Sequence, residues 1–422
     1  MRRFCLPIIL VVLASGIVLE GRIPPTRLGS ELDAEAFFDD AVLHEIRLDM
    51  NRRDWQSLHD RFLENTYYVS DFRWRDHVLR NVGIRSRGTG SRSESKPGLK
   101  LEFDRYVTDQ TFLGLKTTIL RNNAQEASNL NERLSMLLFR RMGLPASRVA
   151  HTRLYVNSEY VGLYSIVESV DKAFLARTYG DDEGYLYDYD YPVSAQPYYF
   201  EYRGSDRRRY VPLPFKPETR ERDPRPEFIE QLVWTINQTS DAVFREAIGE
   251  YLDLVKFVRH VAVEVLVGDN DGILGDFGMN NFYFYRFDNT KLFTFIPWDK
   301  SEAFKNGVES GIFHNISDVP SSAQNRLMTR VLSYPDLYDL YLENLLEGVQ
   351  SIEDRMGSPD ERGWLDREIQ REYEQIRDAA LTDAFKPFTN DEFERAVDSL
   401  REFALRRGDF VRGEVARVRA VR

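Results

Sequence analysis

Strand-like patterns of hydrophobic and polar residues recur along the first part of the chain. They cover residues 42–50, 77–88, 98–106 and 117–123. Successive side chains of a strand point to opposite faces, so alternation predicts half-buried β-strands. Residues 151–170 carry two further runs on either side of Asn157–Ser158, which predicts a β-hairpin with its turn at these two residues.

Helical periodicity appears twice in the first part of the chain and then dominates the second part. Residues 51–63 predict a helix begun by Asn51, and residues 128–142 predict one with Asn129 and Glu132 as a capping pair, ended by Gly143 and Pro145. Further helices are expected over 228–238, 241–252, 254–268 and much of the chain after Val331. Two aromatic segments, 281–287 and 292–298, are the one strand pair expected there. The chain is therefore predicted to be α+β, with a strand-rich part followed by a helical part.

The N-terminus has a different character. Arg2 and Arg3 precede the apolar run FCLPIILVVLASGIVL, which is typical of a secretory signal or an N-terminal membrane anchor over residues 1–21. An apolar helix packed on the core is the alternative. Residues 22–40, rich in Pro, Gly and acid, are expected to be a linker. We therefore expect an exported protein, secreted, periplasmic or at the cell surface, or one held at the membrane by this segment.

Composition narrows the class of protein. The 422 residues suffice for two or three lobes, and 42% hydrophobic and 30% charged residues are typical of a folded soluble protein. A net charge of −11 argues against a nucleic-acid partner, which needs a basic face. The single cysteine lies in the apolar N-terminal run, so no disulfide is expected in the rest of the chain.

Acidic and amide residues gather around the aromatic strand pair, between residues 268 and 304. Asp269, Asp271 and Asp276 precede it, Asn281 opens it, and Asp299 follows it. Oxygen ligands of this kind suit a divalent cation that carries nucleotide phosphates. The letters Asp-Phe-Gly at 276–278 match a kinase signature. In kinases a strand pair precedes this signature, whereas here the strand pair follows it, so we interpret the match as chance.

A basic segment in the strand-rich part offers the matching phosphate contacts. Glycines between strands let backbone N–H groups approach phosphates, and neighbouring cations neutralise the phosphate charge. The alternative is a solvated basic loop. The segment contains Arg85, Arg87, Gly88, Gly90, Arg92, Lys96 and Lys100.

Five stretches, in this order, resemble the family of spore coat protein H (CotH) kinases, which are atypical protein kinases. The resemblance extends from about Val42 to Val418. Its motifs are RSRGTGSRSESKPGLKLEF, NNAQEASNLNERLSMLLFRRMGLPA, LYVNSEYVGLYSIVESVDKAFL, DNDG with NNFYFY, and IPWDKSEAF, at 85–103, 122–146, 154–175, 269–285 and 296–304.

The resemblance implies a two-lobed protein-kinase-like fold. Residues 41–170 would form a β-rich N-lobe, residues 171–350 a helical C-lobe, and residues 351–422 an extension of the C-lobe with extra helices. The implied activity is transfer of the ATP γ-phosphate to Ser or Thr hydroxyls of a protein, itself included, with Mg²⁺ or Mn²⁺. The alternatives are an inactive kinase-like binding module and an ATP-dependent transferase that acts on a non-protein acceptor or transfers AMP.

Site roles follow from the same resemblance. Asp299 and Asn281 would bind the metal, although a helix cap and a turn residue are the respective alternatives. Asp271 would be the catalytic acid, with Asp276 and Asp269 as rivals, because Asp271 precedes Asn281 by ten positions where the family pattern has about five.

The remaining implied contacts concern ATP. Arg87, Gly88, Lys96 and Lys100 would face its phosphates, with Lys100 and Lys96 rivals for the kinase lysine. Glu132 is a candidate partner of that lysine, although its capping position is a sufficient structural reason for it. Glu168 would lie at the hinge, where backbone groups meet the adenine.

Overall fold

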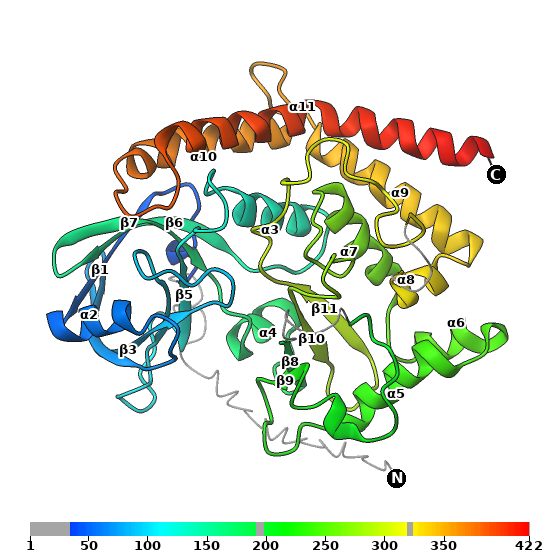
Figure 1. The fold of residues 1–422 in the computed structure, drawn as a ribbon, viewed down its shortest axis with the longest axis horizontal. Coiled ribbons are helices and arrows are strands. Elements are labelled where there is room, and N and C mark those ends of the chain that lie inside the picture. Colours follow the sequence, from blue (N-terminus) through cyan, green and yellow to red (C-terminus); the bar gives the residue numbers. More distant parts are fainter. Residues whose placement is uncertain (1–33, 191–197, 319–323, 422) are drawn as a thin grey trace, which may run out of the picture.

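The computed structural model describes residues 34–190, 198–318 and 324–421. Seven strands form a closed barrel in the first part (Figure 1), in the order β1-β2-β3-β4-β5-β7-β6. The β1–β6 pair is parallel and the other pairs are antiparallel. The strands are β1 (His44–Met50), β2 (Tyr68–Trp74), β3 (His77–Arg87), β4 (Gly98–Glu102), β5 (Thr117–Arg121), β6 (Val149–Val156) and β7 (Glu159–Val167), with helix α2 (Arg52–Asp60) between β1 and β2.

The barrel core extends into the predicted linker. Phe37 is fully buried and its ring packs edge-on against Phe72, Trp74 and Phe112. The compact part of the chain therefore reaches back at least to Ala34, before the expected boundary at residue 41. The predicted signal or anchor, and residues 22–33 of the linker, lie outside the described residues.

The β6–β7 hairpin forms as its sequence predicts. Asn157 and Ser158 have φ values of 51° and 69°, the left-handed conformation that tight hairpin turns require. The Asn157 side chain also accepts a hydrogen bond of 2.9 Å from the backbone N–H of Met50, which ties the turn to β1. Local turn chemistry and the strand pattern thus agree here.

The second part contains a larger sheet than the sequence predicts. The expected aromatic pair, β10 (Phe282–Arg286) and β11 (Phe293–Pro297), is extended by β8 (Tyr185–Tyr189) and β9 (Phe215–Pro217) in the order β11-β10-β8-β9. The prediction of a single strand pair was wrong, because β8 and β9 are short and lie in a turn-rich segment without a clear period. The charged segment 203–226 also contains a short 3-10 helix, η1 (Arg207–Arg209).

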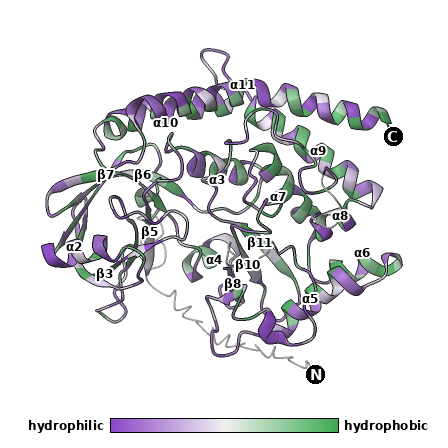
Figure 2. Ribbon diagram, viewed as in Figure 1, coloured by the Kyte–Doolittle hydropathy of each residue, from purple (hydrophilic) through white to green (hydrophobic). Residues whose placement is uncertain are grey.

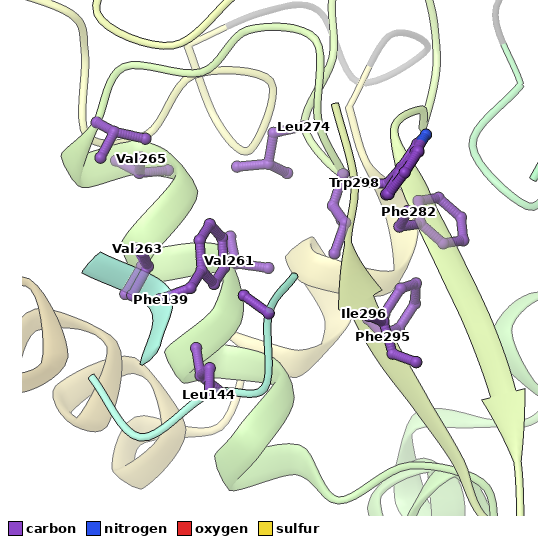
Figure 3. Packing of buried hydrophobic residues seen from close by; sticks show 14 of the residues in the cluster. Phe139, Leu144, Val261, Val263, Val265, Leu274, Phe282, Phe295, Ile296 and Trp298 are labelled. Carbon is purple, nitrogen blue, oxygen red and sulfur yellow. The ribbon is translucent and has the colours of Figure 1, made fainter. Parts of the chain in front are cut away.

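Helices surround this sheet, and one apolar core joins them (Figure 3). Val261 and Val263 of the α7 helix, Phe139 of the α3 helix and Phe295 of β11 belong to it. Burial of such side chains supplies most of the stability of a domain. Between α2 and residue 352, the helices of the described chain are α3 (Asn131–Arg141), α4 (Lys172–Tyr179), α5 (Pro226–Gln238), α6 (Asp241–Gly249), α7 (Leu254–Leu266), α8 (Arg326–Val331) and α9 (Pro335–Ile352).

Two C-terminal helices connect both parts of the molecule. Helices α10 (Trp364–Leu381) and α11 (Asn390–Val421) run side by side across one edge of the structure (Figure 1). Hydrophilic and hydrophobic residues alternate along them (Figure 2). Helix α10 contacts β7 and α3, and α11 contacts α9. Together, helices α10 and α11 therefore contact the barrel as well as the other helices, whereas residues 351–422 are predicted to extend the helical part alone.

A buried charge cluster fixes α3 against α10. The Arg133 guanidinium lies 3.0 Å from Glu372, and His151 of β6 lies 2.8 Å from the other Glu372 oxygen. All three side chains are essentially fully buried. The expected α+β class is confirmed. Among the described residues, no helix combines the length and apolar character needed to cross a bilayer.

Candidate active site

An arginine on β5 connects the barrel to the acid that follows the β10–β11 pair. Arg121 donates a hydrogen bond to the carboxylate of Asp299, and its guanidinium also lies 3.7 Å from Glu132 of α3. Arg121 and Glu132 are 3% exposed, whereas Asp299 is 22% exposed. Burial alone would raise the pKa of Asp299, but Arg121 holds that pKa below its usual value.

Glu132 has a tertiary role rather than the predicted capping role. The residue before α3, Leu130, makes no side-chain cap hydrogen bond. The Glu132 carboxylate instead accepts a 2.6 Å hydrogen bond from the backbone N–H of Lys300, next to Asp299. The capping-pair prediction was therefore wrong, and Glu132 faces Arg121 in a cation–acid pair between strand and helix.

A second buried ion cluster lies behind Asp299. The Lys300 ammonium is 2.6 Å from Glu264 of α7 and 2.8 Å from Asp269, and all three are 0–1% exposed. The two acids outweigh the desolvation of Lys300 and raise its pKa. One oxygen of Asp269 is thus engaged in a buried ion pair, and the other accepts a 3.1 Å hydrogen bond from the backbone N–H of Asp271. Nothing in this arrangement presents Asp269 to a substrate.

Asp271 is held by the two asparagines that precede β10. Asn280 donates to one carboxylate oxygen at 3.1 Å and Asn281 to the other at 2.7 Å. Burial raises the pKa of Asp271 to about 6, although the Asn280 hydrogen bond acts in the opposite direction. A partly buried acid that titrates near neutrality, oriented on both oxygens, is suited to orient a hydroxyl and accept its proton.

The ends of the β10–β11 pair bring Asn281 and Asp299 together. Phe282 is opposite Pro297, and the Asn281 carbonyl accepts a 3.0 Å hydrogen bond from the Trp298 backbone. Asn281 and Asp299 both adopt positive φ, at 54° and 46°. The structure therefore places three sequence-predicted residues, Asp271, Asn281 and Asp299, at one end of one strand pair.

Asp276 lies in a different environment. Its side chain is 46% exposed and accepts a 2.6 Å hydrogen bond from His314, and the following Phe277 is 62% exposed. No hydrogen bond of the described residues joins Asp276 to Asn281 or Asp299. Of the three residues in the literal Asp-Phe-Gly match, Asp276 and Phe277 are exposed and Gly278 is buried.

An aromatic wall borders Asp299. The Trp298 ring packs edge-on against Tyr283 of β10, at 5.2 Å between centroids. The guanidinium carbons of Arg87 and Arg121 lie 5.8 and 5.9 Å from the Trp298 ring centroid. Arg87 is thus brought beside Arg121 and Asp299, on the side of the barrel that faces the second sheet.

The predicted phosphate-facing residues Gly88 and Lys100 lie near this side of the barrel. The strand register places Lys100 of β4 opposite Arg85 of β3 and Ile119 of β5. Ile119 is two positions before Arg121, so the side chains of Lys100, Arg85 and Arg121 lie on one face of the sheet. Burial lowers the pKa of Lys100, and the nearby Arg85 lowers it further. Gly88 has φ +110°, and a Cβ there would lie 2.3 Å from the Ser91 hydroxyl, so the turn requires glycine.

Lys96 does not fit its predicted contact with ATP. Its ammonium lies 2.7 Å from Asp383, in the turn between α10 and α11, and donates to the Leu163 carbonyl at 2.9 Å. Both charged side chains are 1% exposed. We correct the prediction: in this arrangement Lys96 has no surface for a nucleotide, and it ties the glycine-containing segment to the C-terminal helices.

Glu168 occupies the expected connection after β7, but its side chain is engaged. Its two oxygens accept hydrogen bonds from Arg148 at 2.7 Å and from Arg177 at 2.7 and 3.0 Å. Its backbone N–H is bonded to the Arg148 carbonyl. The cap of the next helix is Asp171, which accepts from the N–H groups of Ala173 and Phe174. Contact between this connection and adenine stays a prediction.

Arg121 is the residue that sequence reasoning missed. The strand pattern predicts Arg121 only as a strand residue, and the sequence suggests Lys96 and Lys100 as the phosphate-binding cation. The sequence contains one signal for this role. Arg121 lies in a strand with apolar neighbours, just before the loop 123–130 that leads into the helix, and a cation buried in a strand needs an acid partner.

The donor set fits a divalent cation bound jointly with phosphates. Neither Asn281 Oδ1 nor Asp299 Oδ2 takes part in a hydrogen bond among the described residues, so both oxygens are free to bind. Within the same part of the chain, no group of three or more His, Cys, Asp or Glu side chains is set to hold a metal. Two protein oxygens are nevertheless sufficient for Mg²⁺, which commonly takes its other ligands from phosphates and water.

Comparison with known proteins places this chain in a kinase family. Residues 84–411 match the family model described as CotH kinase protein. The chain therefore belongs to the CotH kinase family. The Inner spore coat protein H of Bacillus subtilis (strain 168) is 23% identical over 339 residues, which cover 80% of this chain and 88% of that protein.

Two solved structures show distant likeness. The proinflammatory kinase CtkA of Helicobacter pylori matches 76% of this chain and 95% of its own, at 10% identity and a TM-score of 0.33. HipA, from a toxin–antitoxin complex of Shewanella oneidensis MR-1 with HipB and operator DNA, matches 81% of this chain and 63% of that chain, at 12% identity and a TM-score of 0.34. At TM-scores this low, neither likeness carries a conclusion about the site.

Proposed function

We propose that this protein is an ATP-dependent protein kinase that transfers the γ-phosphate to Ser or Thr hydroxyls of a protein, itself included. The observation that carries the proposal is the meeting of Asp271, Asn281 and Asp299 at one end of the β10–β11 pair, facing Arg121 and Glu132. Kinases use these kinds of groups: an acid beside the hydroxyl, amide and acid oxygens for the metal, and a cation–glutamate pair. Membership of the CotH kinase family supports the same reading.

Each residue has a distinct part in the proposed reaction. Asp271 orients the attacking hydroxyl and accepts its proton. Arg121, held by Glu132, neutralises phosphate charge where most kinases use lysine, and Arg87 adds a second cation. Asn281 and Asp299 hold the Mg²⁺ or Mn²⁺, which when bound neutralises the charge of the phosphates. The barrel and the helical part with the second sheet act as the two lobes of the kinase.

The deciding experiment compares the wild type with single variants. The purified protein is incubated with γ-labelled or α-labelled ATP and Mg²⁺ or Mn²⁺, beside Asp299→Ala, Asp271→Ala and Asp276→Ala. We expect metal-dependent label on protein from γ-labelled ATP only, abolished by the first two substitutions and kept by the third. Absence of metal-dependent ATP binding would identify an inactive kinase-like binding module. Label from α-labelled ATP would identify AMP transfer.

We also propose that the protein acts outside the cytoplasm or at the membrane, because residues 1–21 combine two arginines with a long apolar run. Cell fractionation and sequencing of the mature N-terminus test this. Recovery of the full-length chain in the cytoplasmic fraction would contradict it.

A further inference from the structure

A pocket of about 690 Å³ lies apart from the residues proposed to handle ATP. Four parts of the chain form it: the segment that leads into α3, the segment 304–309 after Asp299, Phe388 in the turn before α11, and α11 from Ala396 to Arg406. Asp271, Asn281 and Asp299 do not line it. Its volume is in the range that accommodates a small organic molecule.

Glu126, in the wall of this pocket, is a buried acid with one unsatisfied oxygen. The side chain is 4% exposed, and its Oε2 accepts a 2.6 Å hydrogen bond from the Ser128 hydroxyl. Oε1 is buried and has no hydrogen-bond partner. A buried acceptor without a donor has lost its hydrogen bonds to water without replacing them, and the loss is larger when the group is charged, so its presence needs an explanation.

The cations that line the pocket form no ion pair with Glu126 among the described residues. Lys305 donates to the Gln125 carbonyl and to Glu302, both at 2.6 Å, and Arg406 pairs with Glu402 on α11. Glu309, a second acid in the lining, forms no ion pair among the described residues. The two cations of the pocket are thus engaged within the protein, while its acids Glu126 and Glu309 form no ion pair among the described residues.

The rest of the lining supplies apolar surface. Phe304 and Leu400 are 7% and 4% exposed, and Val308 and Phe388 extend the same surface. A suitable occupant therefore combines an apolar body with a cationic N–H donor. Burial raises the pKa of Glu126 to about 7, and the opposing effects of the Ser128 hydroxyl, His151, Lys305 and the Asn129 backbone N–H do not offset it.

We infer that this pocket is a binding site for an organic cation, a primary amine or guanidinium on an apolar body, whose N–H groups meet the carboxylate of Glu126. The amine fills the unsatisfied acceptor and forms a charge-assisted hydrogen bond, while the apolar body covers Phe304 and Leu400. No bond is made or broken in this step.

The position of the site connects it to the segment that carries Asp299. Asn131 lines the pocket and donates to the carbonyls of Ser301 and Ala303, at 3.0 and 2.8 Å. An occupant therefore contacts both the start of α3 and the chain just after Asp299. Binding itself is independent of the proposed kinase activity, so each can fail without the other.

Phenethylamine is a suitable probe, with 2-phenylethanol as its uncharged counterpart of similar shape. Both are titrated into the full chain by calorimetry, in the absence of ATP. We expect saturable binding of the amine and at least about tenfold weaker binding of the alcohol, a difference of about 1.4 kcal/mol. No saturable binding of the amine up to about 10 mM, or equal binding of the two compounds, would overturn the inference.

Two variants locate the binding site. Glu126→Gln keeps the acceptor for Ser128 but removes the charge, and Glu374→Gln is the matched control because Glu374 is an exposed acid of α10 outside the lining. We expect Glu126→Gln to weaken amine binding at least about tenfold and Glu374→Gln to leave it within about twofold. Unchanged affinity in Glu126→Gln would refute the assignment.

A surface variant covers the case in which Glu126→Gln does not fold. Ser399 is an exposed residue of α11 in the lining, so Ser399→Trp fills the pocket from the outside, and Ser399→Ala leaves it open. We expect only the tryptophan variant to lose amine binding, with thermal unfolding unchanged in both. Binding that survives in Ser399→Trp would place the amine elsewhere.

Discussion

Arg121 donates a hydrogen bond to Asp299 across 178 positions of sequence, and Glu132 lies 3.7 Å from the same guanidinium. This one guanidinium joins β5 of the barrel, helix α3 and Asp299, two residues after the end of β11. Since Arg121 and Glu132 are almost fully buried, the geometry of the proposed phosphate site depends on tertiary contacts rather than on a local loop.

Replacing Arg121 by methionine tests this relationship. The substitution leaves Glu132 and Asp299 without their common cation, so we expect kcat/KM for ATP to fall by about 10²–10³-fold, comparable to the loss of a group that stabilises transition-state charge. Steady-state kinetics with labelled ATP measure it. Arg121→Lys should recover part of the activity, and Arg47→Met, at an exposed pair with Glu45, is the control. Normal activity in Arg121→Met would show that the pair is dispensable.

We expect substitutions of Asp271 and Asp276 to have opposite effects on phosphate transfer. Asp271→Asn keeps the shape of the side chain but removes the proton acceptor, so we expect phosphate transfer to fall at least about 100-fold while ATP affinity stays within a few fold. Asp276→Asn alters an exposed group bonded to His314 and should leave the rate within a few fold. Single-turnover transfer and equilibrium ATP binding measure the two quantities. The reverse pattern would make Asp276 the catalytic acid.

The Lys96–Asp383 pair should matter for stability rather than for ATP. Lys96→Met leaves Asp383 buried without its partner, so we expect a loss of about 3–5 kcal/mol in the free energy of unfolding. The folded variant should keep its ATP affinity. Lys116→Met breaks the exposed pair with Asp104 and should cost at most about 1 kcal/mol. Urea unfolding and ATP titration check both claims, and a large loss of ATP affinity in Lys96→Met would restore the nucleotide role that the sequence predicts.

Asp188 of β8 predicts a pH dependence of stability. Burial, followed by the nearby Glu218, raises its pKa to about 7 from an ordinary 3.8. The folded state therefore binds the proton more tightly than the unfolded state, and this contribution to stability is present at low pH and lost as pH rises from about 4 through 7. The linked free energy is up to about 4 kcal/mol, reduced where water reaches the carboxyl.

Asp188→Asn should remove this dependence. We expect the variant to gain stability relative to the wild type between pH 5 and pH 8, measured by urea unfolding at both values. Asp60→Asn, on the exposed surface of α2, is the control and should follow the wild-type curve. A constant difference between wild type and Asp188→Asn across this range would contradict a raised pKa.

Local sequence patterns determined much of the architecture. Alternation and turn residues predicted the β6–β7 hairpin, and the apolar period predicted α3, because these features depend on neighbours within a few positions. The acid and amide residues around β10 and β11 identified the ends of that strand pair as the candidate site. The motifs in their order also indicated the CotH kinase family, which the family match confirms.

Only the tertiary structure decided how the charged residues are paired. In the sequence, Lys96 and Arg121 are both cations in or near predicted strands. In the structure, Lys96 pairs with Asp383, which is 287 positions away, and Arg121 pairs with Asp299. Asp269 is buried against Lys300, whereas Asp271 is oriented by two asparagines. Pairings over such separations leave no local period or spacing in the chain. The sequence therefore determined which charged groups are present, and the folded contacts determined which of them are buried, which are paired, and which are proposed to act on a substrate.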